Sequence, residues 1–157
     1  IPLRVTHNDT KLNNVLLDRQ TGRGVCVIDL DTVMPGLAAY DFGDSIRFGA
    51  STAAEYEPDL RRVQFSLPMF EASTRGFLQE AVQTLGARDI ELLPMGAKLM
   101  TLECGMRFLA DYLNGDKYFR VHREGHNLDR ARTQFKLVRC MEENWAQMAD
   151  IVRQCAQ

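Results

Sequence analysis

The hydrophobic pattern changes along the chain, and this change limits the folds that the chain can adopt. Residues 1–36 contain short apolar runs of strand length, and Pro35 and Gly36 then interrupt regular structure. From Glu57 onward, apolar residues recur at intervals of three and four, which is typical of helices. We therefore predict an α+β chain that is predominantly helical, with a small β region at its start.

Turn residues and local apolar spacing indicate where the individual strands and helices lie. PLRVTH is predicted to be a strand, and NNVLLD, the turn RQTGRG and VCVIDLD are typical of a β-hairpin. AAYDFGDSIRFGA is predicted to be a loop that runs into a short helix. Further helices are expected on both sides of Gly86, one of them with Leu99, Leu102, Met106, Leu109 and Leu113 on one shared face, and a last helix is expected from Asn127 to Gln154.

Length and composition exclude several classes of protein. With 157 residues and 45% hydrophobic content, residues 1–157 are expected to form a single domain. A formal net charge of −2 lacks the positive field that nucleic-acid binding requires. No apolar run approaches the roughly 18 residues of a membrane span, and the start has no signal-peptide pattern. We expect a cytoplasmic protein without nucleic-acid or membrane partners.

The stretch THNDTKLNN, residues 6–14, concentrates short polar side chains directly after the first strand. Asp9 is followed five residues later by Asn14, and Asp29 and Asp31 lie on the far strand of the predicted hairpin. Phosphoryl transfer from a nucleotide requires a carboxylate that accepts the hydroxyl proton and oxygen ligands for magnesium. Protein kinases place an Asp, an Asn and a second Asp in this order. The spacing therefore indicates a kinase-like catalytic loop.

The same residues carry a resemblance to a known family. HNDTKLNN resembles the H-x-D-x-x-x-x-N catalytic loop of aminoglycoside phosphotransferases and choline kinases, a branch of the protein-kinase-like fold, and VIDLD occupies the place of their magnesium-binding motif. DTVMPGLAAYDFGDSIRFGA, RFLADYLNGDKYF and HNLDRARTQFKLV are similar to stretches of the N-acetylhexosamine 1-kinases in that superfamily. The resemblance spans Val5 to about Val138.

The resemblance implies the chemistry of the catalytic loop. Asp9 would be the general base on the acceptor hydroxyl. Asn14 and Asp29 would bind magnesium, and Asp31 would be a further ligand or a substrate contact. The implied cofactors are Mg and ATP, and the implied acceptor is a small molecule, an amino sugar such as an N-acetylhexosamine.

Four further residues receive supporting roles from the resemblance. His7 would orient the catalytic loop and Asp41 would brace it, although a carboxylate at this position could also serve only to complement a helix dipole. Arg107 and Tyr118 lie where such kinases hold the sugar. An arginine on an apolar helix could equally extend to water without binding anything.

The sequence shows no sign of a nucleotide-covering lobe, which would require a phosphate-covering loop, a strand lysine and a glutamate that orients it. In the resembling family this lobe precedes the catalytic loop, and the chain opens on Ile1 already inside a strand. We therefore expect the C-terminal catalytic and acceptor-binding lobe of a larger kinase, inactive by itself. Apolar surface near residues 1–30 would then favour self-association.

Two other functions remain open at this point. VCVIDLDTV resembles the nucleophile strand of haloacid-dehalogenase-type phosphatases, in which Asp29 would attack phosphorus and Asp31 would act as acid and base. That fold requires a doubly wound parallel sheet, and no convincing parallel strand follows Ala50. The chain could also be a non-catalytic sugar-binding module.

Overall fold

Two small antiparallel sheets open the chain in the computed structural model, which describes residues 1–157. β1 pairs with β4, and β2 pairs with β3. The strands and the two 3-10 helices are β1 (Arg4–Thr6), η1 (Leu12–Asn14), β2 (Val15–Leu17), β3 (Gly24–Val27), η2 (Leu30–Thr32) and β4 (Met34–Gly36). The polar stretch after Thr6 joins β1 to η1, so it lies between the two sheets and not within the hairpin.

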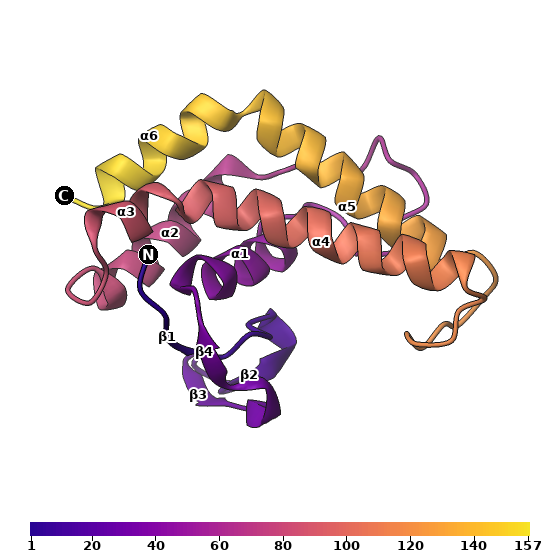
Figure 1. Cartoon of the computed structure of the whole chain (residues 1–157), viewed down its shortest axis with the longest axis horizontal. Helices are drawn as coiled ribbons and strands as arrows, with labels where there is room; N and C mark the ends of the chain where they lie inside the picture. The colour runs from indigo at the N-terminus through magenta and orange to yellow at the C-terminus, as the bar shows by residue number, and fades with distance from the viewer.

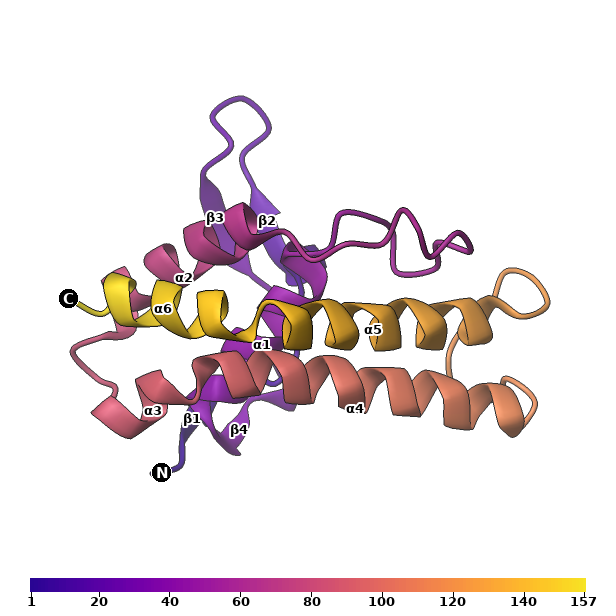
Figure 2. The same ribbon diagram turned by 90° about the horizontal axis from the view of Figure 1, so that it is seen from above.

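Helices form the rest of the chain. They are α1 (Ala38–Gly49), α2 (Leu67–Ala81), α3 (Ala87–Glu91), α4 (Leu93–Leu113), α5 (His126–Glu143) and α6 (Trp145–Cys155). Figures 1 and 2 show α4 and α5 side by side in opposite directions, with α6 continuing beyond α5 and the two sheets beside α1. The predicted α+β class with predominantly helical content is confirmed.

The hydrophobic core lies among the helices and does not extend into the two sheets. Its largest fully buried side chains come from five helices and the segment before α2. They are Phe42, Ile46, Val63, Phe70, Leu78, Leu93, Leu137, Met141, Met148 and Val152. Because α1 contributes to this core, the residues on its outer surface are held rigidly against the sheets.

α1 and α4 approach so closely that glycine is required on both. A Cβ atom on Gly43 would lie 2.3 Å from the backbone oxygen of Gly96, and a Cβ on Gly96 would lie 2.2 Å from the oxygen of Ala39. No side-chain movement can relieve these contacts, since backbone atoms make them. The two glycines therefore fix the distance between the helix that follows the sheets and the long helix that carries Arg107.

Several predicted element boundaries were wrong. The stretch from Ala38 is helical from its first residue, without the expected loop. Residues 57–66 are not helical despite their spacing; α2 begins only at Leu67, after Ser66 caps it by accepting the N–H of Met69. The last helix is broken at Asn144 into α5 and α6.

The shared apolar face predicted for α4 is not the face that the helix buries. Leu99, Met106 and Leu113 are exposed by 43%, 52% and 74%. Its buried face instead carries mostly small side chains where α1 and α5 approach closely, with Leu93 and Phe108 as its large members. The buried positions of α4 are Leu93, Pro94, Gly96, Ala97, Thr101, Cys104, Gly105, Phe108 and Asp111.

Exposed apolar side chains concentrate in the β region. Twelve of the nineteen exposed large apolar side chains lie within residues 1–34, so this region carries most of the exposed large apolar side chains of the molecule. The predicted self-association through this surface stays a prediction. None of the helices combines the length and apolar character that crossing a membrane requires.

Candidate active site

The predicted catalytic loop, residues 7–14, begins at His7 and is held by the first turn of α1. The backbone N–H of His7 donates to Asp41 Oδ2 at 2.8 Å, and that of Asn8 donates to Asp41 Oδ1 at 2.7 Å. Asn8 has a φ of 65°, in the left-handed region that Asn tolerates better than most residues. Asp41 thus lies against the loop, in the position that a brace requires.

The ring of His7 connects the catalytic loop to the segment before Asp29. Its Nδ1 accepts the backbone N–H of Asp9 at 3.3 Å, so the hydrogen resides on Nε2, which lies 3.1 Å from the oxygen of Ile28. The hydroxyl of Thr32 donates to the oxygen of His7 at 2.7 Å. These bonds hold the loop and the 28–32 segment together.

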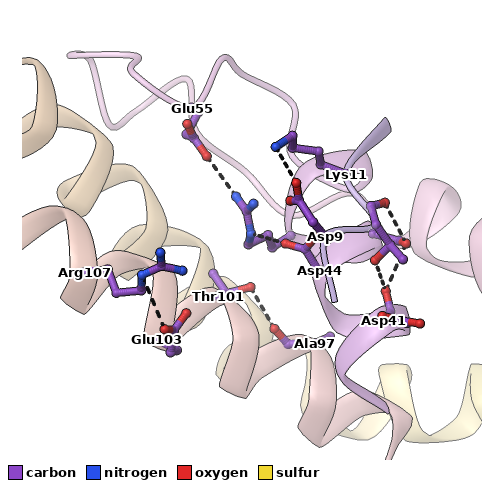
Figure 3. A network of polar contacts seen from close by, with 12 residues as sticks. Asp9, Lys11, Asp41, Asp44, Glu55, Ala97, Thr101, Glu103 and Arg107 are labelled. Atoms are coloured by element: carbon purple, nitrogen blue, oxygen red, sulfur yellow. Dashed lines mark hydrogen bonds and ion pairs between the residues drawn. The ribbon is translucent and has the colours of Figure 1, made fainter. Parts of the chain in front are cut away.

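The carboxylate of Asp9 is held by two side chains of its own loop. Lys11 Nζ and Asn14 Nδ2 donate to Asp9 Oδ2 at 2.7 and 2.9 Å, and Asn14 Nδ2 also donates to the Asp9 backbone oxygen. Burial disfavours the charged form, but these hydrogen bonds and the positive charges of Lys11 and Arg47 outweigh it, so the pKa of Asp9 lies below its ordinary value. Figure 3 shows the Lys11 contact. Asp9 is therefore ionised and oriented.

The β2–β3 pairing brings Asn14 close to the acidic segment. Val15 lies opposite Val27, and the backbone N–H of Ile28 donates to the oxygen of Asn14 at 2.9 Å. Asp29 follows directly, with a φ of 65°, at the start of η2. The prediction that Asp29 and Asp31 lie on a strand was wrong, because β3 ends at Val27.

Asp29 and Asp31 interact closely. A side-chain hydrogen bond and charge repulsion from Asp31, together with the charge of Asp9, raise the pKa of Asp29 above its ordinary value. Carboxylates that repel one another in this way form a favourable position for a cation.

The donor set near Asp29 fits magnesium. Asn14 directs its Nδ2 to Asp9, so its Oδ1 takes no part in that contact, and the backbone bond from Ile28 to Asn14 ties Asn14 to the residue that precedes Asp29. No three His, Cys, Asp or Glu side chains of the chain are arranged as a metal site, so the candidate set depends on the Asn14 amide. Carboxylate and amide oxygens are the ligands that Mg²⁺ prefers.

A cavity of about 490 Å³ is lined by Asp9 and also by the predicted acceptor-binding residues. Its wall contains Asp9 and Lys11 from the catalytic loop, together with Arg107 and Tyr118 from the other side. In Figure 3 the side chain of Arg107 rises from α4 across from the loop that carries Asp9 and Lys11. The complete lining is Asn8, Asp9, Lys11, Asn13, Thr32, Arg47, Phe48, Glu55, Cys104, Arg107, Phe108, Tyr118, Phe119 and Arg130.

Arg107 is supported by aromatic rings and has only a weak ion pair. Its guanidinium carbon lies 5.8 Å from the ring centre of Tyr118 and 5.4 Å from that of Phe119. Its nearest carboxylate is Glu103, with Nε 3.7 Å from Oε1. Since the side chain is half exposed and contributes to the cavity wall, its N–H groups remain available to a ligand.

Four charged residues of this cavity, Lys11, Arg47, Glu55 and Arg130, were missed by sequence reasoning. Lys11 could have been found, because it lies two positions after Asp9 in an extended loop and therefore on the same side. Arg47 donates to Glu55 at 2.8 Å, and Glu55 also lies 3.4 Å from Nε of Arg130. No sequence signal connects these three residues, since they come from α1, the segment after it and α5.

Two observations argue against other reactions at this site, one with a cysteine nucleophile and one of the haloacid-dehalogenase type. Burial raises the pKa of the Cys104 thiol in the cavity wall to about 11, so it stays protonated and is a poor nucleophile. The structure contains only two two-stranded antiparallel sheets, whereas a haloacid-dehalogenase nucleophile strand belongs to a parallel sheet. The phosphatase alternative thus has no support from the fold.

A larger hollow of about 760 Å³ between α3 and α6 contains none of the candidate residues.

Residues 1–78 match the sequence model of the phosphotransferase enzyme family, APH. The matched segment contains the catalytic loop, the acidic pair of Asp29 and Asp31, and Asp41, whereas Arg107 and Tyr118 lie beyond it. Over residues 1–78, slightly less than half of the chain, the sequence is thus similar to phosphotransferases.

Proposed function

We propose that this chain is the catalytic and acceptor-binding part of an ATP-dependent kinase that phosphorylates a hydroxyl of an N-acetylhexosamine or a similar small alcohol. One observation carries the proposal: an ionised Asp9, held by Lys11 and Asn14, lines the same cavity as Arg107 and Tyr118. The match to the phosphotransferase family supports the reaction class.

Each residue of the site has a part in the proposed reaction. Asp9 accepts the proton of the acceptor hydroxyl as that oxygen attacks phosphorus. Asn14, Asp29 and Asp31 hold magnesium, which with ATP supplies the transferable phosphoryl group and neutralises its charge. Lys11 orients Asp9 through the 2.7 Å contact.

The remaining residues position the loop and the acceptor. His7 and Asp41 keep the catalytic loop in one conformation through the hydrogen bonds described above. Arg107 and Tyr118 donate hydrogen bonds to the oxygens of the acceptor from the opposite wall of the cavity. Acceptor and base are thus brought together by different parts of the chain.

The charge of the cavity favours a neutral acceptor. Its two lining carboxylates, Asp9 and Glu55, are already paired with Lys11 and with Arg47 and Arg130. Arg107 adds another positive charge. Polycationic aminoglycosides and choline would therefore meet more positive than negative charge, whereas the hydroxyl and amide groups of an N-acetylhexosamine would not be repelled.

The test is nucleotide-dependent phosphorylation of N-acetylglucosamine and N-acetylgalactosamine, measured on this chain and on the longest natural polypeptide that contains it. Asp9→Asn should lower kcat by about 10²–10⁴-fold, the range for loss of a general base. Asp18→Asn is the matched control: it changes an exposed carboxylate in the hairpin turn, whose contacts are with Gln20 and Thr21, and activity should remain.

The outcomes separate the alternatives. Activity on another alcohol, but on no amino sugar, would retain the kinase mechanism and reject the sugar. Full activity of the Asp9→Asn protein would reject Asp9 as the base. Sugar binding without any transfer by the longest polypeptide would favour the non-catalytic binding module.

A further inference from the structure

The segment of residues 114–125 between α4 and α5 contributes Tyr118 and Phe119 to the cavity wall, yet it contains no helix or strand. Such a segment has no hydrogen-bond ladder of its own, so its backbone donors need partners elsewhere. The position of this wall therefore depends on whatever groups accept those bonds.

The carboxylate of Asp111 accepts three of them. Its Oδ1 accepts the backbone N–H of Lys117 at 3.0 Å and of Tyr118 at 2.9 Å, and its Oδ2 accepts that of Phe119 at 2.9 Å. Asp111 belongs to α4 and is only 7% exposed. Three consecutive backbone donors thus converge on one buried side chain.

Asn127, at the start of α5, completes the arrangement. Its Nδ2 donates to Asp111 Oδ2 at 2.9 Å and to Asp116 Oδ1 at 2.8 Å, and the residue is fully buried. Asp116 has a φ of 54°, a left-handed conformation that costs a non-glycine residue about 1–2 kcal/mol. The bonds from Asn127 to Asp116 and to Asp111 hold this turn in its unfavourable conformation.

Only an ionised carboxylate can accept all four bonds. Burial disfavours its charge, but the donors from residues 117–119 and Asn127 outweigh burial and lower the pKa of Asp111 below its ordinary value. An asparagine in its place would present one accepting oxygen and one NH₂ donor, so it could not accept at both ends.

The segment in turn positions other side chains of the wall. The ring of Phe119 lies 4.7 Å from that of Phe108, and both Phe119 and Tyr118 lie under the guanidinium of Arg107. Asp111 itself does not line the cavity that contains Asp9.

We propose that Asp111 is a positioning residue of the acceptor cavity, which fixes the backbone of residues 117–119 and thereby the wall formed by Tyr118, Phe119 and Arg107. Its effect on acceptor binding rests on the function proposed above. Its effect on the wall does not depend on that function.

The experiment compares the whole chain with its Asp111→Asn variant by NMR. Hydrogen exchange of the backbone amides of residues 117–119 should accelerate about tenfold or more, because bonds to a charged acceptor are lost. The contact between the rings of Phe108 and Phe119 should weaken in nuclear Overhauser spectra. The dissociation constant for N-acetylglucosamine should rise by about tenfold.

Asp89→Asn is the matched control. Asp89 is similarly buried, at 3% exposed, and its carboxylate accepts the N–H of Gly86 and a bond from Arg4, remote from the cavity. Exchange at residues 117–119 and the affinity for N-acetylglucosamine should stay as in the unmodified chain. If Asp111→Asn does not fold, Asn127→Ala, which keeps the carboxylate but removes one of its donors, is measured in the same way.

The outcomes decide separately on Asp111 and on the acceptor. Unchanged exchange at residues 117–119, or faster exchange with the Phe108–Phe119 contact intact, would overturn the positioning role. Unchanged affinity despite a loosened wall would overturn its effect on binding. If the unmodified chain binds no N-acetylglucosamine, the acceptor assignment fails, while exchange and ring contacts still decide on Asp111.

Discussion

Replacing Gly43 by alanine tests the close contact that sets α1, and with it the catalytic loop, against α4. The added Cβ would lie 2.3 Å from the oxygen of Gly96, about 1.1 Å short of the 3.4 Å at which ordinary contact begins. Because the obstacle is backbone, the two helices must move apart by a comparable distance. Overpacking of this kind typically costs about 1–3 kcal/mol, and more in rigid sites.

The same substitution also removes the intrinsic helix cost of glycine, which is about 1 kcal/mol. With the overpacking cost at the upper end, a net loss of about 2 kcal/mol is expected, and a melting temperature lower by roughly 4–8 °C for a chain of this length. Gly76→Ala is the control, since Gly76 is exposed within α2 with nothing within 4 Å of an added Cβ. It should stabilise by about 0.5–1 kcal/mol.

Urea unfolding followed by circular dichroism measures both variants. Opposite signs for the same chemical change would support the contact between the helices. A Gly43→Ala protein as stable as the Gly76→Ala protein would refute the argument, because α1 and α4 would then tolerate the extra atom without moving apart.

Two further predictions concern stability. Asp41→Ala should destabilise by about 1–3 kcal/mol in urea unfolding, because two backbone N–H groups at the start of the catalytic loop lose their acceptor; an unchanged midpoint would contradict this bracing contact. Burial, followed by the charges of Arg130 and Arg123, lowers the pKa of His126 below its ordinary value of 6.5. Its contribution to stability should therefore be complete above about pH 6.5 and be lost as the pH falls through the lower folded-state value. His126→Gln should show a weaker decline over that range.

The polar loop at residues 6–14 could be located from the sequence because its residues are close along the chain. Asp9, Lys11 and Asn14 interact within six positions, and the hairpin that brings Asp29 nearby is itself local. A pattern of residue types at fixed spacing is sufficient to describe such a site.

Helix boundaries and buried faces were harder to predict. The apolar spacing of residues 57–66 suggested a helix, yet these residues pack in an irregular segment that forms a single bridge between Ser51 and Phe65. Leu99 and Met106 lie on the shared apolar face predicted for α4, but the opposite side of the helix, with mostly small residues, is the one that is buried. The periodicity of a sequence shows which face of a helix is apolar. How the neighbouring helices pack decides which face is buried.

By itself, the sequence determined the helical α+β class and the position of the polar loop at residues 6–14. Only the tertiary structure revealed the cavity, because Arg47, Glu55 and Arg130 come from distant parts of the chain. It alone also revealed that Asp111 holds the wall that carries Tyr118. The physical reason is that short-range hydrogen bonds depend on residue spacing, whereas contacts between distant segments depend on how closely the helices pack.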